Sequence, residues 1–290
     1  MKKIFASVLF TLFFLNSYAQ FGTFKKKEDL EKFKDSKLIV VMFNDSAYNA
    51  SVAAAMEKYW SFTAFDFAAD DEMAKYRKGN YTFLIFSKAK GSKNKSKLGS
   101  SEDDLNGLAI INKFSKRATK ENLLAYAFCN NKIDTQDWET EMIRGVQLLN
   151  NYFNYAVQVE KDRDLSESSM MANYPSDKSN LFDKKLLIEN KQIQLKGKEE
   201  PMDVYGGEVE AEVEDEEIQT AIKNQDNSIM YFYYAKDEKS CNKLFVSAAN
   251  SELMYFVTSA PDKCKCELKD LKALKDMREN LSKKNSKNKD

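Results

Sequence analysis

The order of apolar and polar residues along the chain predicts short strands that alternate with amphipathic helices. A continuous apolar run at 38–43 is typical of a strand buried on both faces, and residues 48–60 place apolar side chains at helical spacing. In the first half of the chain we expect strands over 38–43, 62–67, 81–87 and 105–111 and helices over 48–60, 70–78 and 119–129.

One pattern occurs twice. Residues 66–86 hold an acidic first turn, a short amphipathic helix, a turn and an apolar strand, and residues 213–232 repeat this order. Within the repeat, Asp70-Asp71-Glu72-Met73 matches Asp215-Glu216-Glu217-Ile218. The second half predicts strands over 185–189, 208–213, 228–234, 241–247 and 253–258, helices over 214–224 and 267–282, and a shortened or lost helix within 190–205.

These elements predict an α/β protein of two similar β-α-β-α-β-β units, an internal duplication, joined by a long helix and a linker. The expected boundaries are a signal peptide at 1–19, a lead-in at 20–36, a first unit at 37–133, a connecting helix at 134–163, a linker at 164–183, a second unit at 184–283 and a disordered tail at 284–290.

The connecting helix carries an apolar stripe at three- and four-residue steps. Its members are Trp138, Met142, Val146, Leu149 and Phe153. Such a stripe can bind a partner or a second copy of the chain, as in a coiled coil, or it can pack across a sheet. We favour packing across a sheet because only three heptads are supported.

The N-terminus has the order of a signal peptide. The basic pair Lys2-Lys3 precedes an apolar run, and Ser17-Tyr18-Ala19 provides a small-x-small cleavage site before Gln20. The apolar run is short for a membrane span, and no later stretch is long and apolar enough to be one. We therefore expect an exported protein, periplasmic or secreted, with no membrane span in the mature chain.

A hairpin in the second half carries a family resemblance. At Cys241-x-Lys243, Ala248-Ala249-Asn250 and Leu253-x-Tyr255-Phe256 it is similar to a hairpin in an uncharacterised family of exported proteins from Bacteroidetes-type bacteria, and the Ala19-Gln20 junction is also typical of those bacteria. The resemblance covers about a fifth of the chain. It implies export and no particular activity.

Composition narrows the chemistry. The chain has no histidine, which removes the usual general base, the commonest zinc ligand and every Ser-His or Cys-His pair. With 45 basic and 45 acidic residues, no overall field attracts nucleic acid, and we expect none to bind. The Lys-rich loop 88–97 is either an anion-binding finger or, as we favour, a solvated connection between strands.

Three carboxylates are candidates for a metal site. We expect Asp45 to follow the first strand and Asp66 and Asp70 to follow the second, where the carboxyl ends of parallel strands meet. They could hold Mg²⁺, which prefers oxygen ligands. The simpler interpretation, which we favour, makes Asp45 and Asp70 helix N-caps.

Three cysteines of the second unit form the other candidate cluster. A bridge from Cys241 to Cys264 or Cys266 is sterically plausible and suits an exported protein. A redox Cys-Lys-Cys pair or a soft-metal site is the alternative, although the spacing differs from that of thioredoxin-like motifs.

The leading functional hypothesis is a non-enzymatic binding or scaffold protein of the cell envelope, without a cofactor, whose partner is another envelope protein or a second copy of itself. The alternatives are a metal-assisted hydrolase that uses Asp45, Asp66 and Asp70, and a two-lobed periplasmic receptor for a small ligand.

Overall fold

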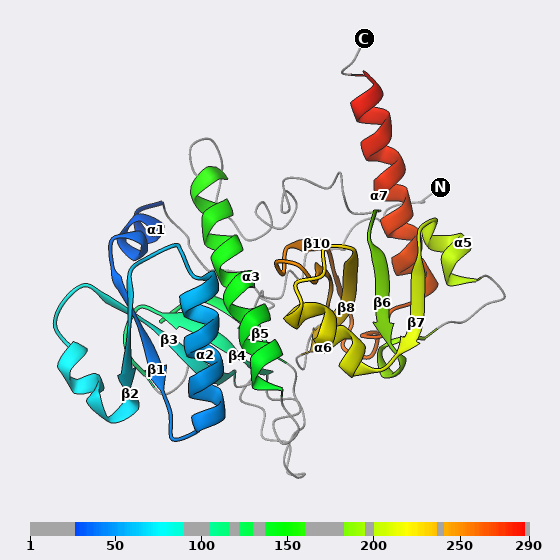
Figure 1. Cartoon of the computed structure of the whole chain (residues 1–290). Coiled ribbons are helices and arrows are strands. Elements are labelled where there is room, and N and C mark those ends of the chain that lie inside the picture. Colours follow the sequence, from blue (N-terminus) through cyan, green and yellow to red (C-terminus); the bar gives the residue numbers. More distant parts are fainter. Residues whose placement is uncertain are drawn as a thin grey trace, which may run out of the picture.

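The chain folds into two five-stranded mixed sheets, each with its own helices (Figure 1). The computed structural model describes residues 27–89, 105–115, 122–129, 137–159, 183–194, 200–236 and 241–287. The predicted α/β fold with two similar units is confirmed. The predicted signal peptide, the Lys-rich loop beyond residue 89 and the linker up to residue 182 lie outside the described residues.

The first unit has its three parallel strands at one side of the sheet and a hairpin at the other. Its elements are α1 (Lys27–Lys34), β1 (Lys37–Met42), α2 (Ser46–Tyr59), β2 (Phe65–Ala69), the 3₁₀ helix η1 (Asp70–Tyr76), β3 (Tyr81–Ala89), β4 (Leu105–Ile111) and β5 (Leu123–Phe128). The strand order is β2-β1-β3-β4-β5, with β1 parallel to β2 and β3, and with β4 antiparallel to β3 and β5.

The second unit repeats this arrangement strand by strand. Its elements are β6 (Lys185–Glu189), η4 (Asn190–Gln192), α5 (Pro201–Tyr205), β7 (Val209–Val213), α6 (Asp215–Lys223), β8 (Ile229–Lys236), β9 (Cys241–Ser247), β10 (Leu253–Ser259) and α7 (Leu268–Lys287). The order is β7-β6-β8-β9-β10, again with three parallel strands followed by an antiparallel pair.

One predicted element is wrong. Residues 119–129 were expected to be a helix, but Leu123–Phe128 form β5, paired with β4. A short apolar run suits a buried strand as well as a helix, and here the neighbouring strand decides, because β4 needs a hydrogen-bonding partner on its free side. The first unit therefore has one strand more than predicted and matches the five strands of the second unit.

Three other elements differ in detail. The strand expected at 62–67 lies at Phe65–Ala69, and the helix after it, η1, is a 3₁₀ helix. The closing helix α7 continues to Lys287, over residues that were predicted to be part of a disordered tail. The shortening of the helix within 190–205 is as predicted, since only η4 and the five-residue α5 form there.

Helix α3 (Trp138–Val159) lies between the two sheets (Figure 1). Residues 140–149 are all buried, so the helix is enclosed around its whole circumference over this part of its length. One continuous group of buried side chains, which we call the inter-unit core, joins α2, α3, α6 and the facing sides of both sheets. The two units are therefore fused around α3 and share a core.

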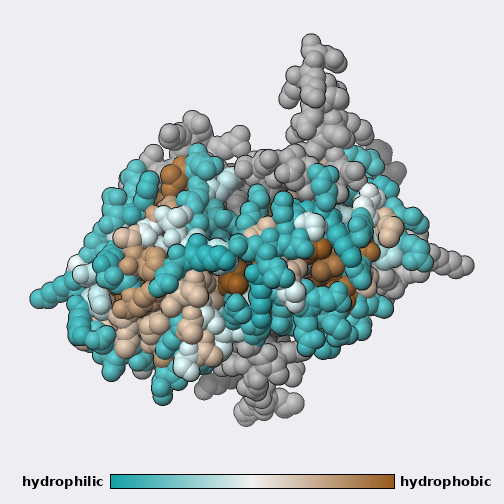
Figure 2. All heavy atoms as spheres, in the orientation of Figure 1, coloured by the Kyte–Doolittle hydropathy of each residue, from teal (hydrophilic) through white to brown (hydrophobic). Residues whose placement is uncertain are grey.

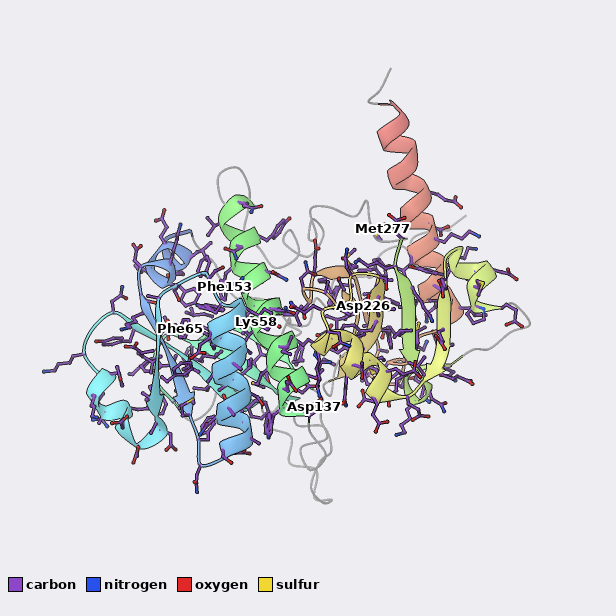
Figure 3. All side chains as sticks on the ribbon, in the orientation of Figure 1. Lys58, Phe65, Asp137, Phe153, Asp226 and Met277 are labelled. Atoms are coloured by element: carbon purple, nitrogen blue, oxygen red, sulfur yellow. A yellow bond between two sulfur atoms is a disulfide. The ribbon has the colours of Figure 1, made fainter. Side chains whose placement is uncertain are left out.

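The apolar stripe of α3 lies inside this core. Met142, Val146, Leu149 and Phe153 are buried and Trp138 is partly buried, so the stripe proposed as a partner surface is covered within the chain. The ring of Phe153, marked in Figure 3, stacks on Phe62 with 5.1 Å between centroids. The packing interpretation of the stripe therefore accounts for these residues.

Polar contacts fix α3 against the second unit. Its buried Arg144 forms an ion pair with Glu141 and lies over the Tyr233 ring, 4.4 Å from the centroid. Toward the second unit, the hydroxyl of Ser251 donates to Oε1 of Gln147 at 2.7 Å. These bonds satisfy polar groups that burial would otherwise make costly.

The first strand-to-strand connection of each unit contains α2 or α5, and the second contains η1 or α6. In the first unit the first connection lies on the sheet face that points toward α3, and in the second unit it lies on the face that points away from α3. In the first unit α2 faces α3 and Met73 of η1 packs on the outer face, whereas in the second unit α6 faces α3 and Tyr205 of α5 packs on the outer face. Corresponding faces of the two sheets therefore point in the same direction, so the second unit is stacked on the first without being turned over. Helices α3 and α7 correspond in the same way: each follows the last strand of its unit and packs on the equivalent face of that unit's sheet.

We predict that Phe153→Ala lowers the free energy of unfolding by about 3–5 kcal/mol, because it opens a cavity in the shared core. Met202→Ala is the control: this side chain is 54% exposed, and its loss should change stability by less than about 0.5 kcal/mol. Urea unfolding followed by circular dichroism measures both. A small effect at Phe153 would contradict the shared core.

The N-terminus of α3 is tied to α6 by an ion pair between Asp137 and Lys223, at 2.5 Å. Partial burial raises the pKa of Asp137, but hydrogen bonds from Lys223 and Thr140 outweigh it and leave the pKa below its usual range. A carboxyl group with a depressed folded pKa stabilises the fold above its unfolded pKa and loses that effect as the pH falls.

We therefore predict that Asp137→Asn, which keeps the side-chain cap on Thr140, flattens the acid limb of the stability profile. The variant should be less stable than the wild type at pH 7 and should approach it below about pH 4, where the wild-type carboxyl group becomes protonated. Urea unfolding across this range measures the difference. An unchanged gap at low pH would contradict the assignment to this ion pair.

Candidate functional site

Asp45 serves as a helix cap. Its Oδ1 accepts a hydrogen bond from the backbone N–H of Tyr48 at 2.9 Å, at the N-terminus of α2. This is the role of an N-cap side chain, and the residue lies just beyond the carboxyl end of β1, as predicted.

The other two carboxylates lie elsewhere. Asp66 is inside β2 rather than after it, opposite Ile39 in the register, and it forms an ion pair with Lys37 at the start of β1. Asp70 is the first residue of η1 and so follows β2, but its predicted role as an N-cap is wrong: Ala69 occupies the N-cap position, without a side-chain capping bond. Asp66, paired with Lys37, is thus separated along β1 from Asp45, which lies beyond the carboxyl end of the strand. Among the described residues no group of three or more Asp, Glu or Cys could hold a metal ion.

The cysteines resolve into one pair and two thiols. Cys241, in β9, forms a disulfide with Cys264, and Cys266 and Cys129 are free and buried. The predicted bridge is therefore present with Cys264 as the partner. Cys129 lies in the inter-unit core, while Cys266 lies on the outer side of the second sheet.

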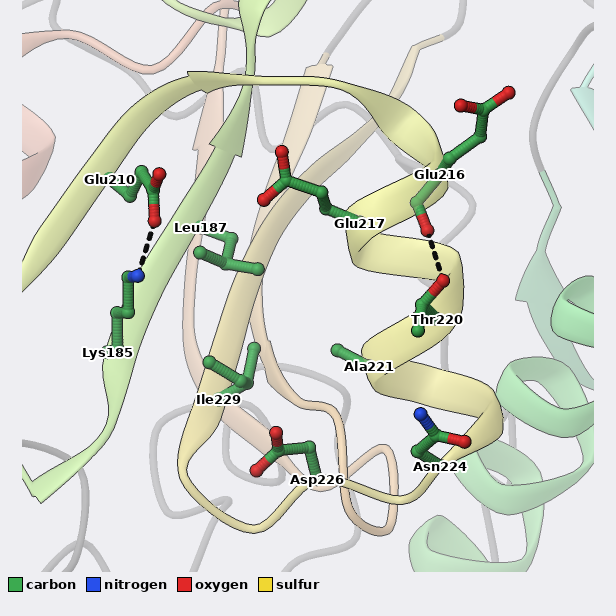
Figure 4. A pocket seen from close by; sticks show the side chains of 10 residues that line it. All are labelled: Lys185, Leu187, Glu210, Glu216, Glu217, Thr220, Ala221, Asn224, Asp226 and Ile229. Atoms are coloured by element: carbon green, nitrogen blue, oxygen red, sulfur yellow. Dashed lines mark hydrogen bonds and ion pairs between the residues drawn. The ribbon is translucent and has the colours of Figure 1, made fainter.

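A groove in the second unit was not expected from the sequence. It has a volume of about 390 Å³ and is bounded by β6, β7, α6 and the turn before β8 (Figure 4). The lining residues are Lys185, Leu187, Glu210, Glu216, Glu217, Thr220, Ala221, Asn224, Asp226 and Ile229. On the face seen in Figure 2, the second unit has a small hydrophobic patch enclosed by hydrophilic residues.

The groove has an apolar floor and an acidic rim. Leu187, Ala221 and Ile229 form the floor, and Glu217 points across it from the first turn of α6 (Figure 4). The lining holds three more carboxylates and a single lysine. That lysine, Lys185, already forms an ion pair with Glu210.

Hydrogen bonds stabilise the charged forms of Asp226 and Lys185. Asp226 accepts from the backbone N–H of Ser228 at 2.8 Å and from its hydroxyl at 2.6 Å, and these bonds lower the pKa of Asp226. The hydrogen bond to Glu210 raises the pKa of Lys185. At neutral pH the groove is therefore a negatively charged surface that surrounds apolar side chains.

The sequence does hold a signal for this groove. Glu208, Glu210 and Glu212 alternate along one strand, and Glu214–Glu217 begin the next helix. Taken alone, the alternation is typical of a strand with one solvated face, and acids in the first turn of a helix suit the helix dipole. What the pattern lacks is the pairing of β7 with β6, which brings the strand and helix acids around one apolar floor.

Comparisons with protein-family models, with curated proteins and with solved structures gave no significant match for this chain. Within the described ranges, no helix is both long enough and apolar enough to span a membrane.

Alanine substitutions separate a capping role from metal binding. Asp45→Ala should lower the free energy of unfolding by about 1 kcal/mol through loss of the cap. Asp66→Ala, which breaks an exposed ion pair, should cost less than about 0.5 kcal/mol. Neither should change the response of thermal unfolding to Mg²⁺. If both substitutions abolished a Mg²⁺-dependent stabilisation, the capping interpretation would be wrong.

Proposed function

We propose that the protein is a non-enzymatic binding protein of the cell envelope, and that its acidic groove holds a cationic segment of another envelope protein. The observation that carries the proposal is the convergence of carboxylates from β7, α6 and the turn before β8 around an apolar floor. No cofactor enters the proposal.

The chemistry of the groove favours a lysine- or arginine-containing segment. The aliphatic stem of such a side chain can cover Leu187 and Ile229, while its charged end reaches Glu217 or Asp226. Because Lys185 is engaged by Glu210, it offsets little of the remaining negative charge. Complementary charge of this kind also speeds the encounter of two partners.

The shared core favours a scaffold over a two-lobed receptor. Closing two lobes around a ligand would require a hinge between the units, but the inter-unit core is continuous from one sheet through α3 to the other. The separation of Asp45 from Asp66 along β1 gives the metal-assisted hydrolase no supporting geometry.

Export remains part of the proposal. It is supported by the order of Lys2-Lys3, an apolar run and Ser17-Tyr18-Ala19, and by the resemblance of the hairpin at 241–256 to exported proteins. The disulfide between Cys241 and Cys264 is compatible with an oxidising compartment.

Titration of the purified protein with tetralysine, followed by calorimetry, tests the groove. We expect salt-sensitive binding that Glu217→Gln weakens about two- to fivefold, as loss of one exposed ion pair of about 0.5–1 kcal/mol implies. Glu214→Gln is the matched control, because it removes a charge from the same helix terminus outside the groove lining.

Equal effects of the two substitutions would refute the groove as the binding surface, and so would an absence of binding at low salt. Native mass spectrometry of the protein from its own host's envelope then identifies the partner, which wild type and Glu214→Gln should retain better than Glu217→Gln.

A further inference from the structure

The segment between β10 and α7 is held on the outer side of the second unit by one covalent and several weak contacts. Cys264 is bonded to Cys241 of β9. Cys266 forms a parallel bridge with Ile193, in which its N–H donates to the carbonyl of Gln192 at 2.8 Å and its carbonyl accepts from Gln194 at 2.9 Å. The disulfide is the strongest of these attachments.

Directly beneath this segment lies a buried ion pair. Lys243 of β9 is fully buried, and its Nζ donates to Oδ2 of Asp270 in the first turn of α7 at 2.6 Å. The same oxygen accepts from the backbone N–H of Glu267 at 2.8 Å. Burying two charges removes their hydration, and their mutual attraction recovers only part of that free energy. If the segment opens, water hydrates both charges again, and this hydration offsets much of the free energy lost with the ion pair.

The apolar contacts of this region are separate from the inter-unit core. Leu271 and Leu274 of α7 pack with Cys266, Phe245 and Tyr205 on the outer face of the second sheet. The inter-unit core, which includes Cys129, lies on the opposite face. Movement of α7 away from the sheet would therefore leave the core around α3 in place.

We propose that the Cys241–Cys264 disulfide is a redox-sensitive latch on α7, opened by a dithiol reductant. A thiolate of the reductant attacks the sulfur of Cys264, the sulfur of Cys241 leaves as a thiolate and takes a proton, and the second thiol of the reductant resolves the mixed disulfide. Cys264 is the sulfur attacked because it is 7% exposed, between the exposed Lys263 and Lys265, whereas Cys241 is fully buried.

Cys266 reports whether the latch is open. In the closed state its thiol is fully buried, and burial raises its pKa, so it reacts poorly. Once the segment is released, the backbone bonds to Gln192 and Gln194 no longer hold it and the thiol meets solvent. Cys129, also buried and free, reports the state of the inter-unit core in the same molecule.

The experiment is labelling of the folded protein with N-ethylmaleimide, before and after incubation with dithiothreitol, with mass spectrometry of each cysteine. In the oxidised protein we expect Cys266 and Cys129 to be protected. After reduction, Cys264 and Cys266 should label at least tenfold faster than Cys129. The double variant Cys241→Ser/Cys264→Ser should label at Cys266 without reductant, and Cys129→Ser should leave Cys266 unchanged.

Two results would overturn the latch. If Cys266 stays protected in the reduced protein and in the double variant, the disulfide does not control the segment. If Cys129 labels in step with Cys266, reduction unfolds the whole chain and no local release takes place. Circular dichroism of the reduced protein provides an independent check that the sheets remain folded.

Discussion

The whole structure depends on the enclosure of α3 between two sheets. A helix that is buried around its circumference loses water on every side, so its apolar residues must meet side chains from both units and its polar residues must find partners within the core. The pair formed by Glu141 and Arg144 is the consequence, since neither charge could remain buried alone. For this reason the two units share their main core, and the apolar stripe of α3 is covered within the chain.

The stacking of the units in the same sense explains how the two long helices differ. Helix α3 follows the last strand of the first unit and α7 follows the last strand of the second, and each covers the corresponding face of its sheet. The far side of α3 is taken by the next sheet, whereas α7 exposes Lys269 and Lys272. Helix α7 therefore presents a polar outer face, whereas the corresponding side of α3 is buried and packs against a second sheet.

Sequence reasoning found most elements, because local periodicity specifies them, and it failed where pairing between distant segments decides. Leu123–Phe128 has no period that separates strand from helix, and only β4 makes it a strand. The stripe of α3 was visible, but Gln147 and Arg144 gave no sign of burial, since they read as the polar side of an amphipathic helix. The sequence predicts a disulfide from Cys241 to Cys264 or Cys266 but does not choose between the two. The choice depends on the pairing of Cys266 with Ile193, a residue far away in the sequence. The groove needed the pairing of β6 with β7.

The two faces of the second sheet have different mechanical roles. Helix α6 contributes Ile218 and Ile222 to the inter-unit core while its Glu217 lines the groove, so a segment bound there bears on a helix that is fixed to α3 through Lys223 and Asp137. On the other face, α7 rests on the sheet and on α5 through a smaller, separate core and one disulfide. Rigid support therefore lies behind the groove, and the helix whose release we propose lies on the opposite face of the sheet.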